Sequence, residues 1–154
     1  MNKIILILLL FSSIFAQANR ILTIAPTAQV SSIGNVTLPM MNPARNLFVK
    51  DHFSFSRVNW MTNIVDDMSY NFINVDRGQY GLNVLFFNYG EQNQTDEFGI
   101  IQSQFTPLSA VYGFSYARKV DKYNLGLDVK LITHNLHTQK ANGFVLGIGG
   151  YFPK

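Results

Sequence analysis

The chain has 154 residues, with 12 Lys and Arg against 9 Asp and Glu, and a formal net charge of +3. It contains no cysteine, which excludes disulfide scaffolds, thiol catalysis and Cys-based zinc or iron–sulfur centres. Charged residues make up 14% of the chain against a usual value of about 25%, and 13 Phe and 7 Tyr contribute to an aromatic share of 14%. No basic cluster stands out, so charge gives no reason to expect a nucleic-acid partner.

The first 18 residues have the three parts of a secretory signal peptide. Met1-Asn2-Lys3 is a positive n-region, Ile4 to Phe15 is an apolar h-region, and Ala16-Gln17-Ala18 is a small-x-small cleavage site. We expect cleavage after Ala18, with Ala16 as the alternative. An uncleaved anchor helix is the less favoured interpretation, because the apolar run is too short to cross a bilayer comfortably.

Residues 19–50 show no clear alternation, and we expect them to form a plug or lead-in segment ahead of a partial barrel at residues 51–154. The segment contains Asn42-Pro43-Ala44. Pro43 fixes its own φ and pushes Asn42 into an extended conformation, which predicts a sharp turn from the segment into the wall. Taken alone, the tripeptide is equally compatible with an ordinary turn before a strand.

Alternation of apolar and polar side chains recurs along the rest of the chain, whereas helical periodicity does not. Successive side chains of a strand point to opposite faces. The clearest case is Tyr123 to Thr133, where the odd positions through Leu131 are apolar and most even positions are small, polar or charged. The pattern predicts six strands: His52–Asn59, Met68–Val75, Gln79–Tyr89, Leu108–Arg118, Tyr123–Thr133 and Gly143–Phe152.

The connections between these strands are expected to alternate between long and short. We predict loops at Trp60–Asp67, Gly90–Pro107 and His134–Asn142, and tight turns at Asp76-Arg77-Gly78 and Val120-Asp121-Lys122. Outer-membrane barrels have short turns on one rim and longer loops on the other. The predicted fold class is therefore all-β, an antiparallel transmembrane β-barrel meander. Six strands would be incomplete, since the smallest such barrels have about eight, so we expect the N-terminal part of a longer protein or a protomer of a shared barrel.

Each predicted strand has one face for lipid and one for a polar lumen. In the strand at Tyr123–Thr133 we expect Leu125, Leu127 and Val129 to face lipid. The candidate lumen-facing residues are Asn83, Asn124, Asp128 and Lys130. The expected aromatic girdle next to the tight turns consists of Tyr80, Tyr116, Tyr123 and Phe152.

Glycines sort onto the non-lipid face, where a missing side chain would let a plug approach the wall or let the sheet curve. They are Gly81, Gly113, Gly126, Gly143, Gly147 and Gly149. The facing also predicts that Leu127→Arg destabilises strongly and that Gly126→Ser is milder.

No motif predicts an enzyme, a cofactor or a metal site. His134 and His137 lack the spacing and the Glu of a zincin, and no Gly-x-Ser-x-Gly is present. A Ser-His-Asn/Asp hydrolase assembled across strands stays open as an alternative. The acid pairs Asp66-Asp67 and Asp96-Glu97 are compatible with Ca²⁺ or polysaccharide, although solvated loops are the better interpretation.

Several short motifs, in order along the chain, resemble the PorV/PorQ family, which is itself similar to FadL-type outer-membrane transporters. They are Asn42-Pro43-Ala44, Asn88-Tyr89-Gly90, Thr95-Asp96-Glu97-Phe98-Gly99, Ser115-Tyr116-Ala117-Arg118-Lys119 and Leu125-Gly126-Leu127-Asp128-Val129-Lys130. The resemblance spans roughly residues 23–152. One departure is the segment between Gly34 and Asn42, which is shorter than the family's Ala/Gly/Asp-rich stretch.

The resemblance implies a lumen-plugged monomeric barrel in the outer membrane, in contact with outer-membrane lipid. For PorV/PorQ relatives it implies a non-enzymatic role in type IX secretion or surface attachment, with the secretion translocon and its cargo proteins as partners. For FadL-type relatives it implies passage of hydrophobic solutes. A secreted soluble β-sandwich with a structural role is the alternative outside this resemblance.

Overall fold

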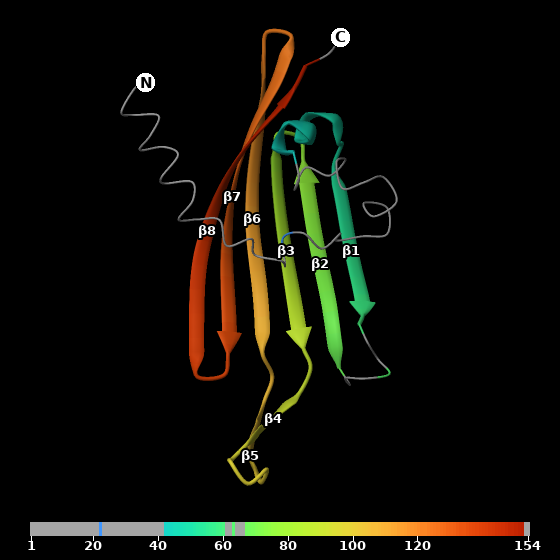
Figure 1. The fold of residues 1–154 in the computed structure, drawn as a ribbon. Helices are drawn as coiled ribbons and strands as arrows, with labels where there is room; N and C mark the ends of the chain where they lie inside the picture. The colour runs from blue at the N-terminus through green and yellow to red at the C-terminus, as the bar shows by residue number, and fades with distance from the viewer. Residues whose placement is uncertain (1–21, 23–41, 61–62, 64–66, 153–154) are drawn as a thin grey trace, which may run out of the picture.

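The computed structural model describes residue 22 and residues 42–60, 63 and 67–152 (Figure 1). The expected signal peptide, its cleavage site at Ala18 and most of the segment 19–50 lie outside the described residues. Apart from Leu22, the described part begins at Asn42, the first residue of the Asn-Pro-Ala turn.

The described residues form an antiparallel β structure with very little helix, which confirms the all-β class. One 3₁₀ helix, η2 (Pro43–Phe48), precedes a six-stranded sheet whose order is β1-β2-β3-β6-β7-β8. The strands are β1 (His52–Asn59), β2 (Met68–Arg77), β3 (Tyr80–Tyr89), β4 (Gln92–Thr95), β5 (Ile101–Phe105), β6 (Leu108–Val120), β7 (Tyr123–Leu136) and β8 (Gln139–Tyr151). Each strand of the large sheet pairs with the next in register, as expected for a meander. Among the described residues the sheet is open, with β1 and β8 at its edges.

Two tight turns lie at one end of the sheet, here called the turn rim (Figure 1). Gly78 and Asp121 begin them with φ values of 58° and 54°, the left-handed backbone that two-residue hairpins require. The opposite end, here called the loop rim, carries the end of β1, the start of β2 and the β4–β5 excursion.

Two of the expected loops are instead paired strands. The predicted loop His134–Asn142 was wrong, because β7 and β8 stay paired as far as Leu136 and Gln139 and turn at His137 and Thr138, with φ 61° at His137. The predicted loop Gly90–Pro107 contains the β4–β5 hairpin. β4 and the start of β8 are polar on both faces, so backbone ladders form there without the alternation that marks a half-buried strand. Among the described residues, the loop rim therefore carries the tight β7–β8 turn as well as the β4–β5 hairpin.

The two faces of the sheet have opposite character, and β7 shows this most clearly. Leu127 and Val129 are 57% and 40% exposed, whereas Asn124 and Asp128 are 9% and 6% exposed. We call the face bearing Leu127 the outer face and the face bearing Asp128 the inner face. Large apolar side chains cover the outer face across the sheet: Phe53, Phe55, Val75, Leu82, Tyr112, Phe114, Leu125, Leu127, Val129, Leu131, Phe144, Leu146 and Ile148.

The inner face changes character along the strands. Near the loop rim it is apolar, with a packed cluster of Tyr70, Phe72, Leu85, Phe87, Val111 and Ile132 against which Leu22 also packs. Near the turn rim it is polar. The change occurs within β2, where buried Tyr70 and Phe72 are followed on the same face by buried Asn74 and Asp76. The aromatic residues of β2 thus lie inside, unlike those of β3 and β6 near the turn rim.

Candidate functional site

The polar half of the inner face is built from two rows of side chains that cross the sheet. The register aligns Asn74, Asn83, Gly113 and Lys130 in one row and Asp76, Gly81, Ser115, Asp128 and Gly147 in the next. The predicted lumen-facing residues Asn83, Asn124 and Asp128 are buried on this face, and Lys130 lies beside Asp128. Burial of so many polar groups demands partners, because each unpaired group costs desolvation free energy.

The Asn-Pro-Ala turn starts η2, which packs against β6, β7 and β8. Asn42 is the N-cap, with φ −141° and ψ 100°, and its Oδ1 accepts a hydrogen bond from the Ala44 amide at 3.1 Å. Pro43 follows in the first helical position, where its missing N–H costs nothing. Asn42 Nδ2 donates to the Gly150 carbonyl of β8 at 3.3 Å. The turn is therefore joined to the wall by its own capping residue.

Glycines in β7 and β8 make this close approach possible. A Cβ at Gly126 would collide with the backbone of Pro43 and Ala44, and one at Gly149 would collide with Asn42 and with Pro43 Cδ. The helix thus lies directly on the backbone of the sheet, as the sorting of glycines suggested for a plug. Gly143 differs, because a Cβ there meets nothing within 4 Å. A side chain at Gly126 would require η2 to move, since the obstructing atoms are backbone and cannot rotate away.

Asn46, in the last turn of η2, holds the helix to the sheet. It is fully buried, and its Nδ2 donates to Ser115 Oγ at 2.9 Å and to the Gln79 carbonyl at 3.3 Å. Its amide nitrogen occupies space that a Cβ at Gly81 would need. Sequence reasoning missed Asn46, because its partners lie 33 and 69 residues away along the chain.

An ion pair occupies the polar row on β7. Lys130 Nζ contacts Asp128 Oδ2, and the two side chains are 12% and 6% exposed. The residues are two apart on one strand, so both project to the inner face. Gly147 of β8 leaves room for the carboxylate, because a Cβ there would overlap Asp128 Oδ1.

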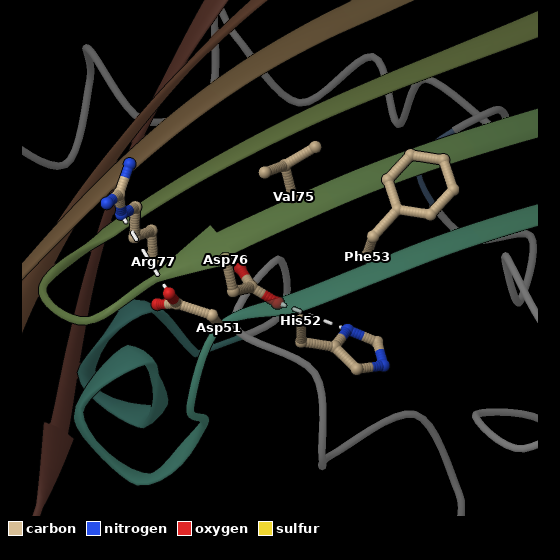
Figure 2. Close-up of a pocket in the computed structure, with 6 residues that line it drawn as sticks. All are labelled: Asp51, His52, Phe53, Val75, Asp76 and Arg77. Carbon is tan, nitrogen blue, oxygen red and sulfur yellow. Dashed lines mark ion pairs between the residues drawn. The ribbon is translucent and has the colours of Figure 1, made fainter.

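A second carboxylate, that of Asp76, lies at the β1 end of the row. Asn74 Nδ2 donates to its Oδ2 at 2.5 Å, and His52 Nδ1 lies 3.9 Å from the same oxygen. A hollow of about 280 Å³ opens here at the sheet edge, with Arg77 Nε 3.9 Å from Asp51 Oδ2 at its mouth (Figure 2). Phe53 and His52 project to opposite sides of β1. The hollow therefore lies where the two faces meet.

Among the described residues, Ser109 and His134 most resemble a catalytic nucleophile–base pair. Ser109 Oγ lies 2.5 Å from His134 Nδ1 and donates to Tyr89 Oη at 3.2 Å. Ser109 is fully buried, so its hydroxyl is not exposed to solvent. The pair is a cross-strand contact on the inner face, since the two residues are register partners. His137 stacks on Phe105, with ring centroids 4.5 Å apart.

Neither the described residues nor comparisons with known proteins assign this chain to a family. Among the described residues no group of three or more His, Cys, Asp or Glu side chains is arranged to hold a metal ion. No helix in the described part of the chain has the length and apolar character needed to cross a membrane. A scan against protein-family models found no match, and neither did a search of curated proteins.

Proposed function

We propose that this chain forms wall strands and an inner plug of a non-enzymatic outer-membrane β-barrel of the PorV/PorQ type. The observation that carries the proposal is the inverted burial of the sheet. Leu127 and Ile148 are 57% and 85% exposed on the outer face, whereas Asn83 and Ser115 are 3% and 1% exposed on the inner face. An antiparallel sheet facing water on one side has apolar side chains inside and polar ones outside. A sheet with lipid outside and a polar filling inside has the reverse arrangement.

Strand lengths and rim composition support the same proposal. β2 and β3 have 10 residues and β7 has 14, against about 9–11 needed for a tilted strand to cross a bilayer. Aromatic side chains gather at the turn rim: the rings of Tyr80 and Tyr116 lie 5.3 Å apart and those of Tyr123 and Phe152 lie 5.1 Å apart. Such clusters suit the level of lipid headgroups.

The secretion or surface-attachment role rests on the resemblance of the ordered motifs to PorV/PorQ proteins. Two of these motifs have a structural part in the described chain. Asn42 caps η2 and bonds to β8, and Asp96 holds the tip of the β4–β5 excursion through its Oδ1 and the Phe98 and Ile100 amides. An excursion beyond the loop rim is where a secreted cargo or a translocon subunit would meet the barrel.

Transport of hydrophobic solutes is the second candidate, and the apolar half of the inner face favours it. Phe72, Leu85 and Val111 are fully buried there, close to the loop rim. Displacement of packed groups such as Leu22 would uncover an apolar lining for a solute. Loss of fatty-acid uptake on deletion, with secretion intact, would favour this candidate over the first.

Fractionation followed by affinity purification tests the leading proposal in two stages. The full protein should be recovered with the outer membrane and should migrate faster on a gel before boiling than after it. Its purification in mild detergent should then recover the secretion translocon, and its deletion should leave secreted cargo unattached to the cell surface. Recovery in the soluble fraction without a heat-dependent shift would contradict the barrel and favour the soluble sandwich.

A further inference from the structure

We propose that the outer face binds one anionic glycerophospholipid, with an acyl chain in an apolar hollow and the phosphate at Arg118. The inference rests on the proposed function, because it requires the outer face to meet a bilayer. The hollow has a volume of about 320 Å³ and lies over β3, β6 and β7. Its apolar lining residues are Leu82, Val84, Tyr112, Phe114, Val129 and Leu131.

The hollow lies between two cross-strand rows of three side chains on the outer face, one through Phe114 and one through Tyr112. Gly113, between them on β6, belongs to the inner face. Phe86 packs edge-on against Tyr112 at 5.9 Å and Tyr80 packs against Phe114 at 6.2 Å, so aromatic pairs bound the hollow at both ends.

Along β6, the outer face continues from the hollow toward the turn rim and ends in positively charged side chains. Tyr116 is next on the outer face of β6, and exposed Arg118 follows it, paired across the ladder with Leu125. Lys122, in the adjoining turn, lies 5.4 Å from the centroid of the Tyr123 ring. Arg118 and Lys122 outnumber Asp121 at this end of the hairpin. A phosphate at this level would meet an Arg fork and an ammonium group.

The spacing between hollow and charge equals the depth of one leaflet. Arg118 lies six residues beyond Tyr112 on β6, which is about 20 Å along a strand. With a barrel tilt of about 40°, this becomes about 15 Å of depth, or half of a hydrocarbon core about 30 Å thick. An acyl chain that starts at a phosphate beside Arg118 would therefore reach the hollow near the bilayer midplane. This match commits the site to a phospholipid of the leaflet at the turn rim.

Native mass spectrometry of the full chain in detergent tests the site with two lipids, dioleoyl phosphatidylglycerol and dioleoyl phosphatidylcholine. Arg118→Gln should weaken phosphatidylglycerol binding about fivefold, the effect of one cation at a membrane surface, and remove its preference over phosphatidylcholine. Lys119→Gln is the matched control, because Lys119 is the next residue and lies on the inner face. Phosphatidylglycerol binding by the Lys119→Gln variant should stay unchanged.

A second pair of variants tests the hollow independently of charge. Val129→Trp should fill the hollow and weaken both lipids alike, whereas Phe55→Trp, on the outer face of β1 two strands away from β3, should weaken neither. Equal phosphatidylglycerol binding by Arg118→Gln and Lys119→Gln, with the heat-dependent gel shift intact, would overturn the lipid site and leave the barrel standing. Absence of the gel shift in the unmodified chain would overturn both.

Discussion

The outer and inner faces of the sheet differ in how their side chains are satisfied. On the outer face, Leu127 and Ile148 stand exposed with no polar contact to make. On the inner face, Asn46 and Ser115 are buried and bonded to each other, and η2 lies directly on glycine backbone. The outer face is therefore specified by hydrophobicity alone, whereas the inner face is specified by hydrogen bonds and by the space that glycines leave. We therefore expect the outer face to be sensitive to added charge, and the inner face to be sensitive to lost hydrogen bonds and added volume.

The largest effect is expected from Lys130→Met on the inner face. It leaves the Asp128 carboxylate buried without its cation, and breaking a buried pair from one side costs about 3–5 kcal/mol. Urea unfolding in lipid vesicles, followed by the fluorescence of the single Trp60, measures the loss. The double variant Asp128→Asn/Lys130→Met should recover most of it. Equal destabilisation by the exposed-site control Lys119→Met would contradict this account of the inner face.

Leu131→Arg should come next, because Leu131 pairs with Tyr112 beside the hollow, near the middle of the outer face. Arg at the bilayer midplane of a barrel destabilises by about 2–4 kcal/mol. The same urea titration measures the change, and Leu127→Arg, which pairs with Tyr116 two rows nearer the turn rim, serves as the graded control with a smaller loss. A soluble sheet would instead gain solubility from both variants and lose little stability.

Gly126→Ala should destabilise by about 1–3 kcal/mol, the usual cost of overpacking a close contact. The new Cβ meets the backbone of Pro43 and Ala44, so η2 must move away from β7. Trypsin cleavage after Lys50 should accelerate along with the change in unfolding free energy. Gly143→Ala is the control, since a Cβ there has open space. Similar behaviour of the two alanines would argue against docking of η2.

The smallest expected effect is a pH-dependent change in local stability at the tip of the β4–β5 excursion. The Ile100 amide donates to the Asp96 carboxylate and lowers its pKa, with further help from Gln102 and Phe98. A carboxyl whose folded pKa is depressed contributes stability above its unfolded value, about 4, and loses it as the pH falls through the folded pKa. The protection of amides at the tip of the β4–β5 excursion against hydrogen exchange, relative to the intrinsic rate at each pH, should be high at neutral pH and fall in acid.

Asp96→Ala should lower this protection at neutral pH and remove its dependence on pH. Glu97→Ala removes an equal charge from the neighbouring position and should leave both unchanged. Identical exchange in the two variants would contradict the role of the Asp96 hydrogen bonds.

A strand can be predicted from the sequence when its two faces lie in different environments, one apolar and one polar. The alternation of β7 identified the strand and both its faces, because each face has its own solvent. Gln92–Thr95 and Gln139–Asn142 were predicted as loops, since both of their faces are polar and their ladders leave no trace in the pattern. Within β2 the pattern could not show that Tyr70 and Phe72 point inward, because alternation fixes opposite faces without saying which is which.

The candidate site was predictable in part for a similar reason. Asn42-Pro43-Ala44 signalled a turn through local backbone rules, and Asn83 and Asp128 stood out as polar positions within apolar strands. The docking of η2 required contacts between residues 108 apart, such as Asn42 with Gly150, for which a single sequence carries no local signal.

A cysteine scan of β7 tests the central claim most directly, because the chain has no native cysteine to interfere. Single cysteines at residues 124–131 would carry nitroxide labels in membrane-reconstituted protein. The inverted faces predict high accessibility to oxygen at 125, 127, 129 and 131 and low accessibility at the positions between them. High accessibility at those odd positions to a water-soluble relaxation reagent, with little to oxygen, would contradict a lipid-facing outer surface.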